Sequence, residues 1–315
     1  ALDTAPLPHA AEMARDVAQT CWARLTELTE QRTRGAREAY VACQLVQAAL
    51  CAADSLAKAL RHLDLALILG GPSQVLNDCF QILEGAAPPL AANAAGASQL
   101  PPPSELPTLS RPVERRVAPD VDAFRPYFRE NQPLLVEGAM ASWSACDAWA
   151  DFDRLSERYG DRLVPIEVGV INVDAERGGS GGEAAPAKRH RSNGGPGAAG
   201  AVDDSGWSER ITTMRDFLSR LREAVPPEQK GYLAQHPLFD QMPGLRADFE
   251  APRLCAVGRL QHINAWLGPA GTITPLHFDS YDNFLAQAVG FKYVRLYAES
   301  ETARLYPLTR RGDGL

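Results

Sequence analysis

The sequence lacks several features that would assign it to common classes of protein. Its six cysteines are scattered, without a C-x-x-C pair or the density of a secreted disulfide framework. No apolar run approaches the length of about 18 residues that spans a bilayer, and the N-terminus has no basic-then-apolar signal pattern. The formal net charge of -7 lacks the basic surplus typical of nucleic-acid binders. We therefore expect a protein of the nucleus or cytoplasm, without membrane or direct nucleic-acid contacts.

A helical pattern occupies about residues 9–83. Apolar residues in Leu56–Leu67 recur at three- and four-residue steps, which indicates one buried helix face. Gly70, Gly71 and Pro72 are typical of a helix end followed by a new helix start. We expect a domain of three or four packed helices over residues 1–84. Residues 85–111 are rich in Ala, Pro and Ser without apolar periodicity, which predicts a linker.

Residues 112–315 are expected to form a second domain of short strands, which favours a sandwich or barrel in an α+β chain. One helix is predicted at Met214–Val225. The predicted strands are rich in strand-forming residues and bounded by Gly or Pro: Leu134–Glu137, Leu163–Val168, Ile263–Leu267, Phe284–Val289 and Lys292–Tyr297.

A Gly-, Ala- and Ser-rich stretch at residues 178–206 interrupts this second domain. Its composition predicts a disordered surface insertion. The basic cluster Lys188–Arg191 could be a nuclear localisation signal, but a solvated loop is the better interpretation of four residues.

The pattern H-x-D occurs twice and is typical of a metal site only once. His62 and Asp64 lie in a helical stretch, where residues two apart point about 200° from each other and cannot share one ion. His277 and Asp279 lie in a strand-like stretch, where residues two apart share a face. They are predicted to bind one metal ion, as two members of a 2-His-1-carboxylate iron site. Zinc is the competing metal, because it accepts the same ligands.

Two polar residues after this motif favour iron. Lys292 offers a cation for the far carboxylate of a dicarboxylate co-substrate, and Asn283 offers a neutral hydrogen-bonding group. The alternative for Lys292 is a surface lysine beside the turn at Gly290.

These motifs closely resemble the Jumonji-C (JmjC) family of 2-oxoglutarate oxygenases. The resemblance is carried by Ile263–Asp279, Asn283–Gln287 and Gly290–Tyr297, with upstream likeness at Val164–Gly169 and Gly231–Gln241 and a looser one at Ala59–Gly70. It implies an α+β fold in which the helical N-terminal domain precedes a JmjC cupin-like double-stranded β-helix, or jelly roll. It implies Fe(II) on His277 and Asp279, and 2-oxoglutarate as co-substrate held by Lys292, Asn283, Thr274 and Tyr232. Substrate-binding residues implied by the same likeness are Glu167, Trp207, Trp266 and Gln235, although both tryptophans could equally serve core packing.

The function implied is oxidation of a protein or peptide side chain. A carboxylate pairs with a guanidinium and indole rings stack on it, so we expect arginine hydroxylation by the complete form of the protein. The alternatives are demethylation of histone methyl-lysine, as in a chromatin regulator, and a non-catalytic binding protein whose helices dock a partner. The family takes its second histidine ligand from a later strand, whereas no histidine follows Asp279 here. We therefore expect a cupin domain truncated at its C-terminal end, as a fragment, an incomplete gene product or a non-catalytic relative.

Overall fold

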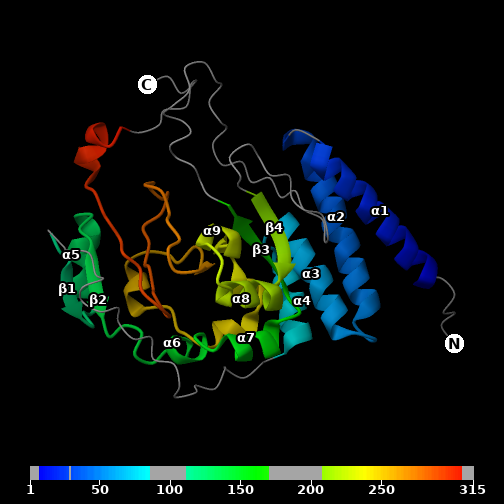
Figure 1. Ribbon diagram of the computed structural model, residues 1–315, viewed down its shortest axis with the longest axis horizontal. Helices are drawn as coiled ribbons and strands as arrows, with labels where there is room; N and C mark the ends of the chain where they lie inside the picture. Colours follow the sequence, from blue (N-terminus) through cyan, green and yellow to red (C-terminus); the bar gives the residue numbers. More distant parts are fainter. Residues whose placement is uncertain (1–6, 28–29, 86–110, 170–207, 307–315) are drawn as a thin grey trace.

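The computed structural model describes residues 7–27, 30–85, 111–169 and 208–306 (Figure 1). The predicted linker lies almost entirely outside the described residues, and so does the predicted insertion. Trp207, a predicted substrate residue, also lies outside them.

Four helices precede residue 85, and each break between the last three follows from local chemistry. They are α1 (Leu7–Glu27), α2 (Glu30–Cys51), α3 (Leu56–Gly70) and α4 (Gln74–Glu84). Ser55 caps α3 by accepting a hydrogen bond from the Lys58 backbone N–H, and Ser73 caps α4 in the same way. Gly71 follows α3 with a φ of 84°, a value that glycine adopts readily. The predicted break at Gly70–Pro72 is confirmed.

The rest of the described chain mixes short helices with short strands. The strands are β1 (Glu114–Val117), β2 (Leu134–Glu137), β3 (Leu163–Val168), β4 (Ser208–Thr213), β5 (Leu233–His236) and β6 (Ala265–Leu267). The helices are α5 (Val121–Arg129), α6 (Ala145–Ala148), α7 (Phe152–Tyr159), α8 (Met214–Arg222), α9 (Pro227–Lys230), α10 (Leu238–Gln241) and α11 (Pro243–Arg246), with 3-10 turns at Arg253–Val257 and Glu299–Arg304. In the described residues the strands pair as β1–β2 (parallel), β3–β4 (antiparallel) and β5–β6 (antiparallel).

The predicted strands that are confirmed have a neighbouring strand to pair with, and those that are wrong have none among the described residues. The strands at Leu134–Glu137 and Leu163–Val168 are confirmed, and the third is shortened to Ala265–Leu267. The predicted helix at Met214 ends at Arg222 instead of Val225. The predictions for Phe284–Val289 and Lys292–Tyr297 are wrong, because neither segment pairs with another strand among the described residues. Their β-forming side chains favour an extended backbone, but a sheet also requires hydrogen-bonded neighbours.

The β3–β4 hairpin lies between two hydrophobic clusters (Figure 1). On one face Val164 and Ile166 are buried with Phe217 of α8. On the other face Leu163 and Ile211 pack against the cluster of the N-terminal helices. Alternation of side chains along a strand produces this double packing.

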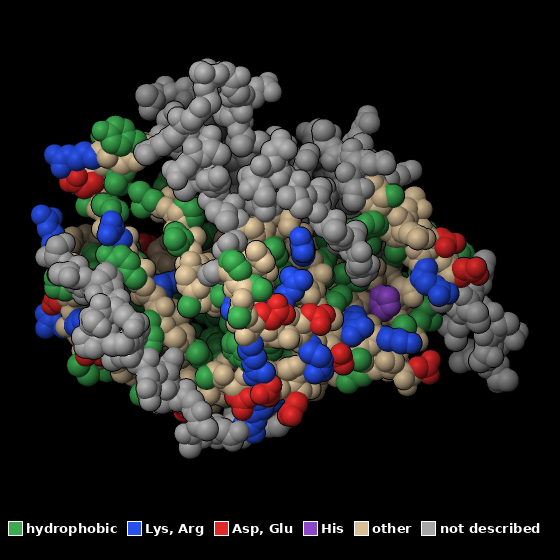
Figure 2. Space-filling model, in the orientation of Figure 1, with side chains coloured by type: hydrophobic (Ala, Val, Ile, Leu, Met, Phe, Trp, Pro, Cys, Tyr) green, Lys and Arg blue, Asp and Glu red, His purple; other side chains and the backbone are tan. Residues whose placement is uncertain are grey.

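The exposed surface of the described chain carries charges of both signs. Figure 2 shows Lys and Arg side chains interspersed with Asp and Glu on one face, and exposed pairs such as Arg222–Asp153, at 2.6 Å, contribute to that pattern. Within the described residues, no helix is both long and apolar enough to cross a membrane.

Candidate functional site

His277 and Asp279 lie close enough to bind one ion together. The His277 Nε2 and Asp279 Oδ1 atoms are 3.7 Å apart, and both side chains are about half exposed. His277 Nδ1 lies 2.8 Å from the Pro275 carbonyl oxygen, which can only accept, so Nδ1 carries the proton. In the neutral ring, Nε2 is then the nitrogen whose lone pair could bind a metal. Asn283 donates a hydrogen bond of 2.8 Å to Asp279 Oδ2, on the other oxygen of that carboxylate.

This donor set fits a metal ion. A ring N–H held by a backbone carbonyl is the usual support of a metal-binding histidine, and a carboxylate ligand is usually held by a hydrogen bond of its own. Both supports are present here. Within the described part of the chain, no cluster of three or more His, Cys, Asp or Glu side chains forms, so the pair stands as two ligands.

One expectation about this pair is wrong. His277 and Asp279 do not lie in a hydrogen-bonded strand, since the segment has no regular secondary structure. Among the described residues no other strand pairs with it, and its apolar side chains are open to solvent, with Phe278 93% and Ile273 85% exposed. The two ligands are instead oriented by local contacts, with the carbonyl two residues earlier and the amide four residues later.

A second group joins Glu167, Tyr232 and Thr274. The backbones of Glu167 and Tyr232 exchange two hydrogen bonds of 2.8 Å, which places β3 beside the start of β5. Burial raises the pKa of the Tyr232 hydroxyl, a hydrogen bond with Thr274 lowers it, and the Glu167 carboxylate raises it. The Tyr232 hydroxyl thus interacts both with a predicted co-substrate residue, Thr274, and with the charge of a predicted substrate residue, Glu167. Thr274 is only three residues before His277.

Two glycines, Gly231 and Gly268, permit the placement of Tyr232, the first by its backbone conformation and the second by leaving room for the ring. Sequence reasoning missed both. Gly231 has a φ of 96° and a ψ of 159°, a region occupied almost only by glycine. A Cβ on Gly268 would lie 2.4 Å from the Tyr232 ring. The tyrosine therefore packs directly on backbone, and the positive φ before it turns the chain from α9 into β5.

The remaining predicted site residues are less closely tied to these two groups. Gln235 is exposed at a bulge in β5 and has a φ of 49°. Trp266 is 48% exposed on β6, and the register sets it across from that bulge. Lys292 is exposed on its extended segment. These three neither contact the His277–Asp279 pair nor one another in any described contact.

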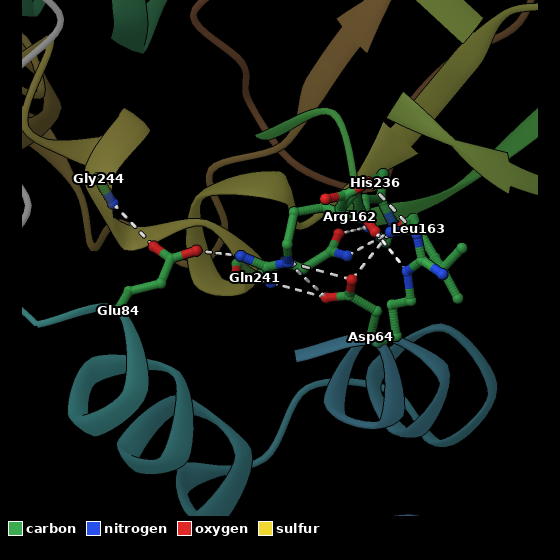
Figure 3. Close-up of polar contacts among 9 residues, drawn as sticks. Asp64, Glu84, Arg162, Leu163, His236, Gln241 and Gly244 are labelled. Carbon is green, nitrogen blue, oxygen red and sulfur yellow. Dashed lines mark hydrogen bonds and ion pairs between the residues drawn. The ribbon is translucent and has the colours of Figure 1, made fainter. Parts of the chain in front are cut away.

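A buried ionic network was missed altogether (Figure 3). Arg162, which directly precedes β3, binds Asp64 of α3 and Glu84 of α4. Asp64 belongs to the H-x-D pattern set aside above, and its partner His62 contacts Gln44 instead, at 2.6 Å. The signal available in the sequence was a single carboxylate inside the apolar run Leu63–Leu67.

Comparison with known proteins shows which family of proteins has this fold and site. Residues 121–314 match the cupin-like domain family. The chain is 37% identical to the Arabidopsis thaliana protein named lysine-specific demethylase JMJ30 over 199 residues, covering 62% of this chain and 39% of that protein. It is 36% identical to lysine-specific demethylase 8 of Danio rerio over 205 residues, covering 63% of this chain and 43% of that protein. It is 32% identical to Jumonji C domain-containing protein 5 of Drosophila melanogaster over 228 residues, covering 69% of this chain and 49% of that protein.

The chain belongs to the JmjC family of cupin-like 2-oxoglutarate oxygenases. It spans less than half the length of each of these relatives. The resemblance drawn from the sequence motifs is confirmed.

Proposed function

We propose that this chain carries an Fe(II) and 2-oxoglutarate site that hydroxylates a protein side chain, specifically arginine. One observation carries the proposal: His277 Nε2 and Asp279 Oδ1 lie 3.7 Å apart, and both ligands are oriented by hydrogen bonds. That arrangement is typical of metal ligands and unusual for an exposed surface pair. We also propose that the protein acts on its substrate in the nucleus or the cytoplasm.

The co-substrate would be held by four residues of this chain. Lys292 would pair with the far carboxylate of 2-oxoglutarate, and Asn283, Thr274 and Tyr232 would donate hydrogen bonds to its oxygens. Iron and 2-oxoglutarate, when bound, would use O2 as the oxidant for a C–H bond, one oxygen atom going to the target carbon and the other to succinate, with release of CO2. The contribution of the protein is to hold the target carbon near His277 and Asp279 and to exclude water.

Glu167 supports arginine as the target. Its carboxylate lies close enough to Tyr232 to raise the pKa of that hydroxyl, and a guanidinium donates two parallel hydrogen bonds to a carboxylate. Trp207 and Trp266 would stack on the guanidinium face, and Gln235 would add a polar contact. A trimethylated lysine has no N–H to donate to Glu167.

The second candidate function is methyl-lysine demethylation, which the names of two relatives favour. The two reactions leave different masses. Hydroxylation adds one oxygen atom to an arginine peptide, whereas demethylation removes a methyl group from a methyl-lysine peptide as formaldehyde.

Mass spectrometry of both peptide types, incubated with the chain, Fe(II) and 2-oxoglutarate, tests the proposal. We expect oxygen gain on arginine only, abolished in His277→Ala and reduced about 100-fold in Glu167→Gln, which loses a charged pairing worth about 3 kcal/mol. Asp161→Asn, an exposed change remote from His277 in the sequence, serves as the matched control. Methyl loss without oxygen gain would replace arginine hydroxylation by demethylation, and no product from either peptide would leave a binding role.

A further inference from the structure

The Arg162 network, defined as Arg162, Asp64, Glu84, Gln241 and His236, joins segments far apart in the sequence (Figure 3). Arg162 donates from Nε to both Asp64 oxygens at 3.1 Å and from a terminal nitrogen to Oδ1 at 2.6 Å. Its other terminal nitrogen donates to Glu84. The Arg162 and Asp64 side chains are 4% and 0% exposed, and that of Glu84 is 8% exposed.

The network also holds the backbone at one end of β3. Asp64 Oδ2 accepts a hydrogen bond of 2.8 Å from the Leu163 N–H, and Gln241 Nε2 donates to the Leu163 carbonyl at 2.6 Å. Both polar groups of Leu163 are therefore bound by side chains of the network. Glu167, the proposed substrate carboxylate, lies at the other end of the same strand.

The same network reaches β5 through one amide. Because Gln241 Nε2 donates to Leu163, its Oε1 faces His236 Nε2 at 2.6 Å, and that nitrogen must carry the proton. His236 is the last residue of β5, and Tyr232 directly precedes the first. Each of the two strands is thus anchored by the network at one end and carries a proposed site residue at the other.

A buried guanidinium of this kind depends on its partners. Removing the Asp64 carboxylate leaves guanidinium donors and the Leu163 N–H without their acceptor in the interior, which is far more disruptive than losing an exposed ion pair. Two carboxylates come from α3 and α4, whereas Arg162 and Gln241 belong to the cupin-like region. Hydrophobic contacts of Leu163 and Ile211 with the helices reinforce the same interface.

We propose that Asp64 and Glu84 are positioning residues, through which the N-terminal helices set the placement of Glu167 and Tyr232. The helices are then a working part of the oxygenase site and not a separate module that docks a partner. The role of Glu167 and Tyr232 in substrate and co-substrate binding rests on the proposed function, but their placement does not.

Hydrogen exchange followed by mass spectrometry tests the placement directly. The Glu167 and Tyr232 amides donate to each other's carbonyls, so their exchange rates report the contact between β3 and β5. In Asp64→Asn we expect these two amides to exchange roughly tenfold faster or more, while amides of α8 keep their rates. Asp161→Asn, which breaks the exposed Arg61–Asp161 pair at 3.3 Å across the same interface, should leave all of these rates unchanged.

Glu84→Gln provides the milder variant in case Asp64→Asn fails to fold. It keeps the shape and one acceptor oxygen but removes one charge, and we expect a smaller acceleration at the same two amides. Arg162→Lys should also show faster exchange at the two amides than the wild type. A lysine ammonium lacks the planar fork with which Arg162 reaches both carboxylates and, at 2.6 Å, the Gln241 carbonyl. Wild-type rates at both amides in Asp64→Asn and Glu84→Gln, or equal acceleration in α8, would overturn the proposal.

Binding of an arginine peptide separates this inference from the proposed function. Weaker peptide binding in Glu84→Gln, together with faster exchange, supports both. Faster exchange in a chain whose wild-type form binds no arginine peptide keeps the positioning role and removes the arginine site.

Discussion

At the scale of single residues, the placement of Tyr232 depends on a backbone that only glycine tolerates. Gly231 has a φ of 96°, and a Cβ there would lie 2.8 Å from Cδ1 of the buried Ile166. Both the conformation and the contact disfavour any side chain. The backbone that carries the Tyr232 side chain thus depends on a residue without a side chain of its own.

We expect Gly231→Ala to lower the free energy of unfolding by about 2 kcal/mol, chiefly because alanine is strained at this φ and ψ. Urea denaturation monitored by tryptophan fluorescence measures the change. Gly258→Ala is the matched control, since Gly258 has a φ of -140° and open space around its Cβ position. It should change stability by less than about 0.5 kcal/mol. Equal losses in the two variants would contradict this account of Gly231.

The two H-x-D patterns show what residue identity alone can predict. The sequence distinguished them by the expected backbone, and helical geometry indeed sends His62 and Asp64 to separate partners. It could not predict that Asp64 binds Arg162, because a contact 98 residues away depends on how the helices pack on β3. For His277, orientation by the Pro275 carbonyl depends on local torsion angles that the motif does not specify.

At the scale of helices and strands, periodicity and the Gly70–Pro72 break predicted the N-terminal helices, α8, β2, β3 and part of β6. The short helices α5, α6, α7, α9, α10 and α11 and the strands β1, β4 and β5 were not predicted. α3, α4, α8, β2 and β3 all begin within two residues of their predicted starts or motifs. β1 was missed, since its sequence Glu-Arg-Arg-Val has no strand-like alternation and all four residues are exposed. Lys292–Tyr297 was wrong for the opposite reason: its side chains favour a strand, but strand pairing is a long-range event. The position of Lys292 in the candidate site could not be predicted for the same reason, because its prediction relied on a strand in the segment Lys292–Tyr297.

The N-terminus of α5 offers a test of capping. Asp120 Oδ1 accepts a hydrogen bond of 2.8 Å from the Ala123 N–H, and its φ and ψ are extended, as a cap requires. We expect Asp120→Ala to lower the free energy of unfolding by about 1 kcal/mol. Asp120→Asn keeps an acceptor oxygen and should lose only a few tenths, about 0.3 kcal/mol. Thermal denaturation of the two variants measures both changes in stability. Similar losses of stability would show that the charge of Asp120 matters more than its hydrogen bond.

At the scale of the whole molecule, the two parts of the chain share one hairpin. β3 contributes Val164 and Ile166 to the cluster on one face and Leu163 to the cluster on the other, where Ile211 of β4 joins it. The strand pair therefore links the core of the cupin-like region to the packing of the helices. The Arg162 network crosses the same boundary with fully buried charges. Cooperative unfolding of both parts in a single transition is the physical consequence.

Two histidines, the half-buried His62 and the buried His236, should make that unfolding sensitive to acid. Burial lowers the pKa of His62 on α3 and, more completely buried, of His236 in the Arg162 network, from the ordinary value of 6.5. Below pH 6.5 the unfolded chain therefore binds more protons than the folded chain, and stability falls as the pH decreases. Glu84 acts in the opposite direction closer to its ordinary value of 4.5, because burial raises its pKa by more than the charge of Arg162 lowers it.

We therefore expect the free energy of unfolding to decrease from about pH 7 to pH 5.5, before the opposing effect of Glu84 becomes large. Urea denaturation across this range measures the slope. The double variant His62→Asn, His236→Asn should be less stable at neutral pH, because two buried hydrogen bonds are altered, yet should show a shallower slope. His262→Asn, at an exposed histidine, controls for the loss of an imidazole alone. An unchanged slope in the double variant would assign the acid sensitivity to other groups and remove the histidines from the account.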